Sequence, residues 1–246
     1  MLCILTTIFA YQQKSIFITL WMRFNMEKSS EYQKEQQEAL GMIRKHLSGL
    51  SGDALAHLKA QISEYLTFRH DVDQFLEKHF SLLCTDTCYR SRLSACCTRE
   101  GIITFFADVV INVLQSSTSE MQVLQKRLAF PCLGNKCLYL GEQGCLWKVK
   151  PLVCEMFLCT KAEKEVLSRN PRAQKAWGKL KQREKSFRWP DQTVLFDTLE
   201  EIFIQAGYTS SLMYLHNSTG LLRVKAIRNG SVKNRARTCT TQSGKK

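Results

Sequence analysis

The chain has 246 residues, of which 44% are hydrophobic and 10% aromatic, so it can bury a sizeable core and is not disordered throughout. Its 4 Pro and 12 Gly are few for this length, which favours long helices over many short strands. The net charge of +13 is unevenly placed, because residues 161–188 carry +7 and residues 223–246 carry +8, leaving −2 for the rest. The cysteine-rich part of the chain therefore carries no excess of positive charge.

The first 25 residues are apolar but match neither a signal peptide nor a membrane span. No basic residue precedes Lys14, and no small-residue cleavage pattern follows the apolar positions. Gln12, Gln13 and Lys14 divide this leader into pieces shorter than the roughly 20 residues that cross a bilayer. We expect translation to start at Met22 or Met26, with export or anchoring as the alternative. The sequence thus predicts a cytoplasmic, reducing location and no membrane partner.

Residues 26–80 are predicted to form a helical hairpin. Residues 31–47 have a helical pattern, and a break at residues 49–52 precedes a position where Ser51 or Asp53 can cap the next helix. Residues 53–80 carry apolar side chains at spacings of three and four, which predicts one long helix with one apolar stripe. The histidines on these helices are expected at surface or half-buried positions and not as metal ligands: His46, His57, His70 and His79.

Further helices are predicted after the first cysteines. Residues 101–114 and 119–130 are apolar enough for buried helices, with Thr104 and Thr118 as candidate caps. Residues 161–188 form a charged helical stretch broken at Asn170-Pro171, and residues 191–206 form a helix that Gly207 ends.

The end of the chain has a different character. Residues 211–216 and 221–227 flank a short turn and are predicted to form a small β-hairpin, followed by a basic tail predicted to be disordered. The predicted fold class is mainly α: a helical domain with an irregular cysteine-rich metal-binding segment and a small C-terminal β-hairpin. The predicted divisions are a leader (1–25), a helical hairpin (26–80), a cysteine-cluster domain (81–160), a basic helical segment (161–207), and the hairpin with its tail (208–246).

Nine of the eleven cysteines lie between positions 84 and 159. In a reducing compartment such clustering indicates metal binding, whereas a disulfide framework would need an oxidising one. Cys132 is expected to be a spare thiol, and Cys3 and Cys239 to be adventitious. The predicted metal ligands are Cys84, Cys88, Cys96, Cys97, Cys137, Cys145, Cys154 and Cys159.

The spacing of these ligands does not identify the metal. Structural zinc and iron–sulfur clusters both take four protein ligands, and the short cysteine pairs suffice for one site or two. The expected cofactor is an iron–sulfur cluster or zinc, in that order of preference. Metal binding would stabilise a small irregular segment that lacks a core of its own, because binding energy becomes folding energy.

A family resemblance covers about residues 84–160. Cys137-Leu-Tyr-Leu, Gly144-Cys145-Leu-Trp, Lys150-Pro151-Leu-Val-Cys154 and Phe157-Leu-Cys159 resemble the second half of the YkgJ-type cysteine-cluster family, and Cys96-Cys97 resembles the double cysteine of its first half. The resemblance implies zinc or iron chelation, and it extends distantly to the cysteine domain of flagellin lysine N-methylase. Two departures are visible: Cys88 lies farther from the double cysteine than the family pattern has it, and Lys150 replaces an arginine, which would weaken a packing or ion-pair contact.

Three functions follow from these patterns. The first is a metal-binding protein with a structural, redox or accessory role. The second is a protein lysine N-methylase-like enzyme, although no glycine-rich nucleotide loop or acid–base pair is visible. The third is a nucleic-acid-binding protein that uses the two basic segments. A protein partner is not indicated. For the cysteine segment, the alternative to a metal site is a helix that starts at Pro151 and contains Cys154 and Cys159, with Phe157, Leu158 and Trp147 as core residues.

Overall fold

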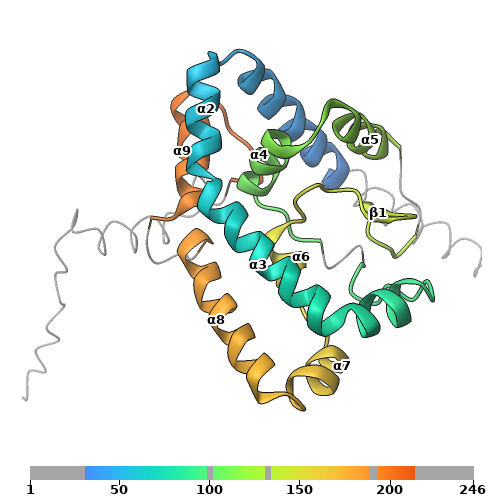
Figure 1. Cartoon of the computed structure of the whole chain (residues 1–246). Coiled ribbons are helices and arrows are strands. Elements are labelled where there is room, and N and C mark those ends of the chain that lie inside the picture. Colours follow the sequence, from blue (N-terminus) through green and yellow to red (C-terminus); the bar gives the residue numbers. More distant parts are fainter. Residues whose placement is uncertain (1–30, 99–101, 131–133, 189–192, 214–246) are drawn as a thin grey trace, which may run out of the picture.

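Helices make up most of the part of the chain that the structure describes, as the sequence predicts (Figure 1). The computed structural model describes residues 31–98, 102–130, 134–188 and 193–213. Within these ranges the only sheet is an antiparallel hairpin of two short strands. No helix in the same ranges is long and apolar enough to cross a membrane. The mainly α fold class is therefore confirmed.

The first predicted helix is present, but the second is divided in two. Residues 31–48 are helical and bury Leu40 and Ile43. The long helix predicted at residues 53–80 is split into α2 (Gly52–Gln61) and α3 (Ser63–Phe80). The division has a local cause, because the Ser63 hydroxyl donates to the carbonyl of Ala60 at 2.8 Å and so competes with the backbone ladder. Ser51 caps α2, as predicted, by accepting the Ala54 N–H at 3.2 Å.

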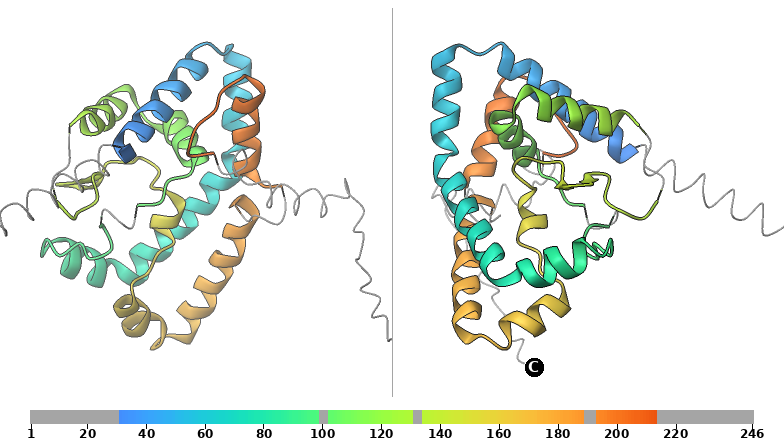
Figure 2. Two further views of the ribbon diagram at one scale, coloured as in Figure 1. Left: turned by 180° about the vertical axis from the view of Figure 1, so that it is seen from behind. Right: turned by 45° about the vertical axis from the view of Figure 1, so that its right-hand side comes forward.

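The apolar stripe of α3 packs against α8 (Pro171–Arg188), and the two helices lie side by side in Figures 1 and 2. Phe68 stacks on Phe187 at 5.1 Å between ring centroids, and Phe75 stacks on Trp177 at 5.4 Å. The predicted break before α8 is confirmed, since the Asn170 side chain accepts the Ala173 N–H at 3.0 Å. Before the break, α7 (Thr160–Ala162) continues into the π-helix η2 (Glu163–Leu167).

The centre of the molecule is α4 (Phe106–Gln115), which is buried along nearly its whole length and packs against α9 (Leu195–Gln205) (Figure 2). Phe106 meets Phe203 edge to face at 5.0 Å. The next helix, α5 (Thr118–Ala129), is capped by Ser117 and not by the predicted Thr118. Thr104 is likewise not the cap of α4, whose first turn is closed by the Asp108 carboxylate accepting the Phe105 N–H at 3.0 Å. Gly207 ends α9 with a left-handed φ of 83°, as predicted.

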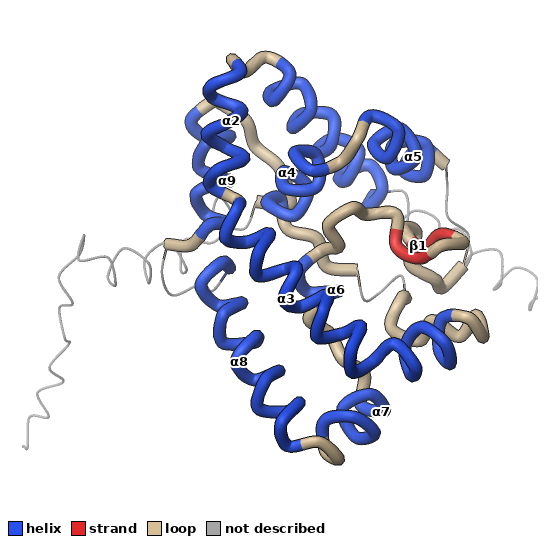
Figure 3. Tube along the Cα trace, in the orientation of Figure 1, coloured by secondary structure: helices blue, strands red, loops and turns tan. Residues whose placement is uncertain are grey.

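The hairpin lies inside the cysteine-rich segment, where the sequence did not predict it (Figure 3). Its strands are β1 (Leu140–Gly141) and β2 (Gly144–Cys145), with Leu140 opposite Cys145. Of the hairpin predicted at residues 211–227, residues 211 and 212 form a turn and the remainder from residue 214 lies outside the described residues. The leader and the basic tail also lie outside them, and the predicted divisions of the chain stay predictions.

Candidate metal centre

All eight predicted ligand cysteines lie in the described part of the chain, and all eight are free thiols. They are carried by the π-helix η1 (Ser81–Tyr89), the turn that follows it, the hairpin segment, and the α6–α7 segment. Figures 1 and 2 show α6 (Leu152–Glu155) between α3 and the hairpin, with the end of η1 close by. Cys3, Cys132 and Cys239 lie outside the described residues.

The first two cysteines stand on η1, which continues directly from α3. The backbone here is a π-helix, so Arg90 N–H bonds to Thr85 O at 3.0 Å and the Thr87 hydroxyl reaches back to Leu82 O at 3.0 Å. Such widened turns are often found at functional sites. Cys84 and Cys88 lie about one helical turn apart, and Cys84 is exposed whereas Cys88 is half-buried.

A tight reversal after η1 brings Cys96 back toward Cys88. Arg92 and Ser94 have left-handed φ values of 62° and 37°, which non-glycine residues rarely adopt. The carbonyl of Cys88 accepts the N–H groups of Leu93 and Ser94, each at 3.1 Å. The sulfur of Cys88 accepts the N–H of Ala95 at 3.4 Å. The reversal thus surrounds Cys88 with backbone donors.

Backbone pairing joins the first group of cysteines (Cys84, Cys88, Cys96 and Cys97) to the second group (Cys137, Cys145, Cys154 and Cys159). Cys137 N–H donates to Cys97 O at 3.0 Å, and Thr98 pairs with Lys136 in an antiparallel bridge. The Lys136 ammonium donates to the carbonyls of Leu93 and Ser94, the second at 3.3 Å. This contact ties the start of the second group to the reversal described above.

The hairpin holds Cys137 and Cys145 at its base. Leu146 N–H bonds to Tyr139 O at 2.9 Å and so closes the base of the hairpin beyond its two strands. The Tyr89 hydroxyl links η1 to the hairpin tip by donating to the carbonyls of Gly141 and Glu142, at 3.1 and 2.5 Å.

Cys154 and Cys159 do not share one helix. The alternative interpretation of this segment, a single helix that starts at Pro151 and contains both cysteines, is therefore wrong. Cys154 lies in the short helix α6, whereas Cys159 precedes α7 with an extended backbone. Phe157 between them is 55% exposed and is not a core residue, although Leu158 packs against the core. Trp147 is buried and meets Tyr139 edge to face at 5.2 Å. Pro151 precedes the first residue of α6, as predicted.

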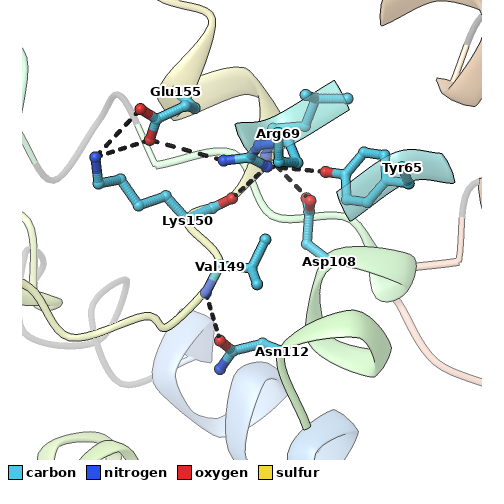
Figure 4. Close-up of polar contacts among 8 residues, drawn as sticks. Tyr65, Arg69, Asp108, Asn112, Val149, Lys150 and Glu155 are labelled. Carbon is cyan, nitrogen blue, oxygen red and sulfur yellow. Dashed lines mark hydrogen bonds and ion pairs between the residues drawn. The ribbon is translucent and has the colours of Figure 1, made fainter. Parts of the chain in front are cut away.

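A buried polar network fixes the segment that carries Cys154 (Figure 4). Arg69 of α3 is 5% exposed, and its guanidinium donates to Lys150 O at 2.8 Å and to the Tyr65 hydroxyl at 2.9 Å. It also lies 3.7 Å from the buried carboxylate of Glu155, which Lys150 approaches to 2.9 Å. Lys150 thus forms an ion pair with the buried Glu155.

Two polar side chains of α4 hold the same segment from the other side. Asn112 accepts the Val149 N–H at 3.1 Å, and Asp108 accepts the Leu152 N–H at 3.0 Å (Figure 4). Burial raises the pKa of Asp108 to about 6, against the effect of the Phe105 and Leu152 N–H groups and of Arg69 and Arg188. Neither residue was predicted from the sequence to belong to the site. The sequence does contain a signal that could have identified them, because an Asp and an Asn stand one turn apart in a helix that is otherwise mostly apolar.

The electrostatics of the thiols reflect their crowding. Burial raises the pKa of Cys84 to about 11, with further contributions from the nearby Cys96, Cys159 and Cys88. Burial also raises the pKa of Cys137 to about 11, and raises those of Cys145 and Cys154. The adjacent pair differs, because Cys96 donates a hydrogen bond to Cys97, which raises the pKa of the first and lowers that of the second. With their pKa values raised, Cys84, Cys137, Cys145 and Cys154 are neutral thiols at neutral pH.

The described thiols are neighbours, but they do not converge on a point. Within the ranges the structure describes, no group of three or more His, Cys, Asp or Glu side chains is arranged so that it could hold a metal ion. His57 and His70 are exposed and His46 and His79 half-buried, as predicted. Comparison of the chain with family models, curated proteins and solved structures gave no match, so the resemblance to the cysteine-cluster family is supported by its motifs alone.

Proposed function

We propose that the protein binds a metal through its clustered cysteine thiolates, as an iron–sulfur cluster or as zinc, in a structural, redox or accessory role. The observation that carries the proposal is that eight free cysteines lie on four segments joined by the Cys137 N–H to Cys97 O bond and by the Tyr89 hydroxyl, with the Ala95 N–H donating to the Cys88 sulfur. Soft thiolate ligands suit zinc and iron–sulfur clusters. Hydrogen bonds to the sulfurs are the outer-shell contacts that orient and tune such ligands.

The surrounding fold supports the same function. The segment that carries Cys154 is held by buried polar contacts from both α3 and α4, which makes its position depend on the rigid core. The thiol side chains themselves are partly exposed, so a metal can reach them. Metal binding to these thiols would add its binding energy to the stability of the fold.

The test is to purify the full chain without oxygen and to determine its absorbance, iron, sulfide and zinc. Broad absorbance near ~400 nm with iron and sulfide indicates an iron–sulfur cluster, and a colourless protein with zinc indicates a zinc site. A variant with Ser at all eight cysteines is the matched control and should hold neither. A wild-type protein without iron or zinc, which also fails to take up either metal on reconstitution, would overturn the proposal.

The two other functions predicted from the sequence stay predictions. Basic side chains of α8 are partly engaged within the protein, since Arg183 pairs with Asp71 at 2.6 Å and Arg188 pairs with Glu184 at 2.5 Å. Lys181 lies over the Trp177 ring at 5.7 Å. These contacts give α8 a role in the fold, so its charge does not by itself favour nucleic-acid binding over solvation. The methylase-like enzyme has no additional observation in its favour.

A further inference from the structure

We infer that Lys136 is a positioning residue of the proposed metal centre, which holds the reversal after η1 against the segment that begins with Cys137. The inference rests on the proposed function and deepens it. Lys136 contacts main-chain carbonyls, so its effect on a bound metal acts through the backbone that carries Cys96, Cys97 and Cys137.

The ammonium of Lys136 holds the carbonyl side of the reversal. It donates to Leu93 O and, at 3.3 Å, to Ser94 O, which also accepts the Cys97 N–H at 3.0 Å. Ser94 is only 6% exposed, and buried main-chain oxygens are almost always paired with a donor. A side chain 42 residues along the chain from Ser94 therefore supplies donors to this turn.

The reversal depends on such contacts because its backbone is unfavourable. Arg92 and Ser94 have left-handed φ values of 62° and 37°, and a conformation of this kind persists only where the surrounding structure fixes it. The Cys88 carbonyl fixes one side of the turn, because it accepts the N–H groups of Leu93 and Ser94. Lys136 fixes the carbonyl side of the same two residues. Loss of the ammonium would leave these carbonyls with fewer donors and the turn less firmly held.

The backbone of the Lys136 segment adds contacts on the other side of the double cysteine. Lys136 pairs with Thr98 in the antiparallel bridge, and the Cys137 N–H donates to Cys97 O at 3.0 Å. The lysine side chain thus holds the chain before Cys96-Cys97, and the bridge holds it after them. Movement of the reversal would shift both cysteines relative to Cys137. Loss of contacts that orient ligands without touching the metal typically weakens metal binding about 10- to 100-fold.

Lys148 provides a matched control for the charge of Lys136. It lies three residues after Cys145, and its ammonium pairs with Glu120 of α5 at 3.2 Å. Lys148→Met removes one positive charge from the cysteine-rich segment and leaves the Lys136 contacts in place. Lys136→Arg keeps the charge and offers a planar fork whose N–H groups can donate to two carbonyls.

The experiment compares Lys136→Met, Lys136→Arg and Lys148→Met with the wild type, all as full chains. Zn²⁺ affinity is measured by competition with a chelator, or, where the protein is isolated with an iron–sulfur cluster, the rate of iron loss to a chelator is measured. Hydrogen exchange of the Cys137 N–H in the purified protein is the second measurement, because it reports on the bond to Cys97 O. Circular dichroism checks folding, and Lys136→Gln, with a shorter and uncharged side chain, replaces the Met variant if that variant unfolds.

Lys136→Met should weaken Zn²⁺ binding, or accelerate iron loss, about 10-fold. It should also accelerate exchange at Cys137 by more than the loss of global stability explains. Lys136→Arg should restore both quantities toward the wild-type values, and Lys148→Met should change neither. An unchanged metal affinity in Lys136→Met, or an equal loss in Lys148→Met, would overturn the positioning role while the wild type still binds metal. A wild type that takes up neither zinc nor iron overturns the proposed function itself, which distinguishes the two failures.

Discussion

The backbone N–H of Cys137 lies 3.0 Å from the carbonyl oxygen of Cys97 and donates a hydrogen bond to it. This bond joins the two halves of the cysteine-rich segment through main-chain atoms and not through sulfur. Main-chain contacts therefore contribute to the scaffold of the candidate site, and the thiols differ from one another by the segments that carry them. The consequences can be tested one contact at a time.

The predicted ligands should behave differently from the remaining cysteines. Replacing Cys145, Cys154 or Cys159 by Ser should lower the metal content and the melting temperature together, because a hydroxyl leaves the ligand shell incomplete. Replacing Cys3 or Cys239 by Ser should change neither quantity. Elemental analysis and thermal unfolding of each variant give the answer, and a common response of the two groups would show that the division into ligands and bystanders is wrong.

Arg69 should contribute much more to stability than Arg183, although each pairs with a carboxylate. Arg69 and Glu155 are 5% and 3% exposed, whereas Arg183 and Asp71 are 44% and 41% exposed. Arg69→Met would leave the buried Glu155 carboxylate with Lys150 as its remaining basic partner. Because a buried charge then loses part of its compensation, the substitution should lower the free energy of unfolding by about 3 kcal/mol. Arg183→Met is the matched control and should cost less than about 1 kcal/mol.

Urea unfolding of the two arginine variants measures this difference. The Arg69 variant should also bind metal more weakly, because the guanidinium fixes the backbone at Lys150, four residues before Cys154. Equal stability losses in the two variants would show that the buried network does not position the cysteine segment.

Asp108 should make stability depend on pH. Burial raises its pKa from 3.8 to about 6, so the folded state binds this proton more tightly than the unfolded state does. The contribution of Asp108 to the free energy of unfolding is therefore greatest below pH ~4 and falls as the pH rises through ~6, by about 3 kcal/mol in all. Asp108→Asn removes the titration.

The measurement is the free energy of unfolding of both proteins between pH 4 and pH 8. Groups that do not interact with Asp108 titrate alike in both proteins and cancel in the difference. The difference between wild type and variant should change by the stated amount between the two ends of the range. A constant difference would mean that Asp108 stays ionised in the fold, where it faces Arg69 and Arg188.

The sequence predicted the helices well where one side of the helix is apolar and the ends carry clear signals. Asn170-Pro171 starts α8 and Gly207 ends α9, both through local backbone preferences that a single sequence contains. The division between α2 and α3 was missed because the hydroxyl of Ser63 competes for a backbone carbonyl, and the apolar spacing continues across it.

The candidate site was predictable in composition but not in arrangement. The cysteines could be singled out by their density, yet their grouping depends on the reversal at Arg92 and Ser94 and on a hairpin only four strand residues long. Neither residue is typical of left-handed backbone, and such short strands have no alternating pattern. The buried polar network joins α3, α4 and the segment before α6, so no local pattern contains it.

The Tyr89 hydroxyl should stabilise the hairpin specifically. It donates to the carbonyls of Gly141 and Glu142, at 3.1 and 2.5 Å, and so connects η1 to the hairpin tip. Tyr89→Phe keeps the ring and should lower the free energy of unfolding by about 1 kcal/mol, the usual net contribution of such a bond. Hydrogen exchange at Leu146 N–H, which bonds across the hairpin to Tyr139 O, should become faster by more than the global loss explains. Tyr208→Phe removes a hydroxyl after α9 while keeping the ring contact with His46, and should leave exchange at Leu146 unchanged. If both variants accelerate that exchange equally, the Tyr89 contact has no local role, and the hairpin opens only when the whole molecule unfolds.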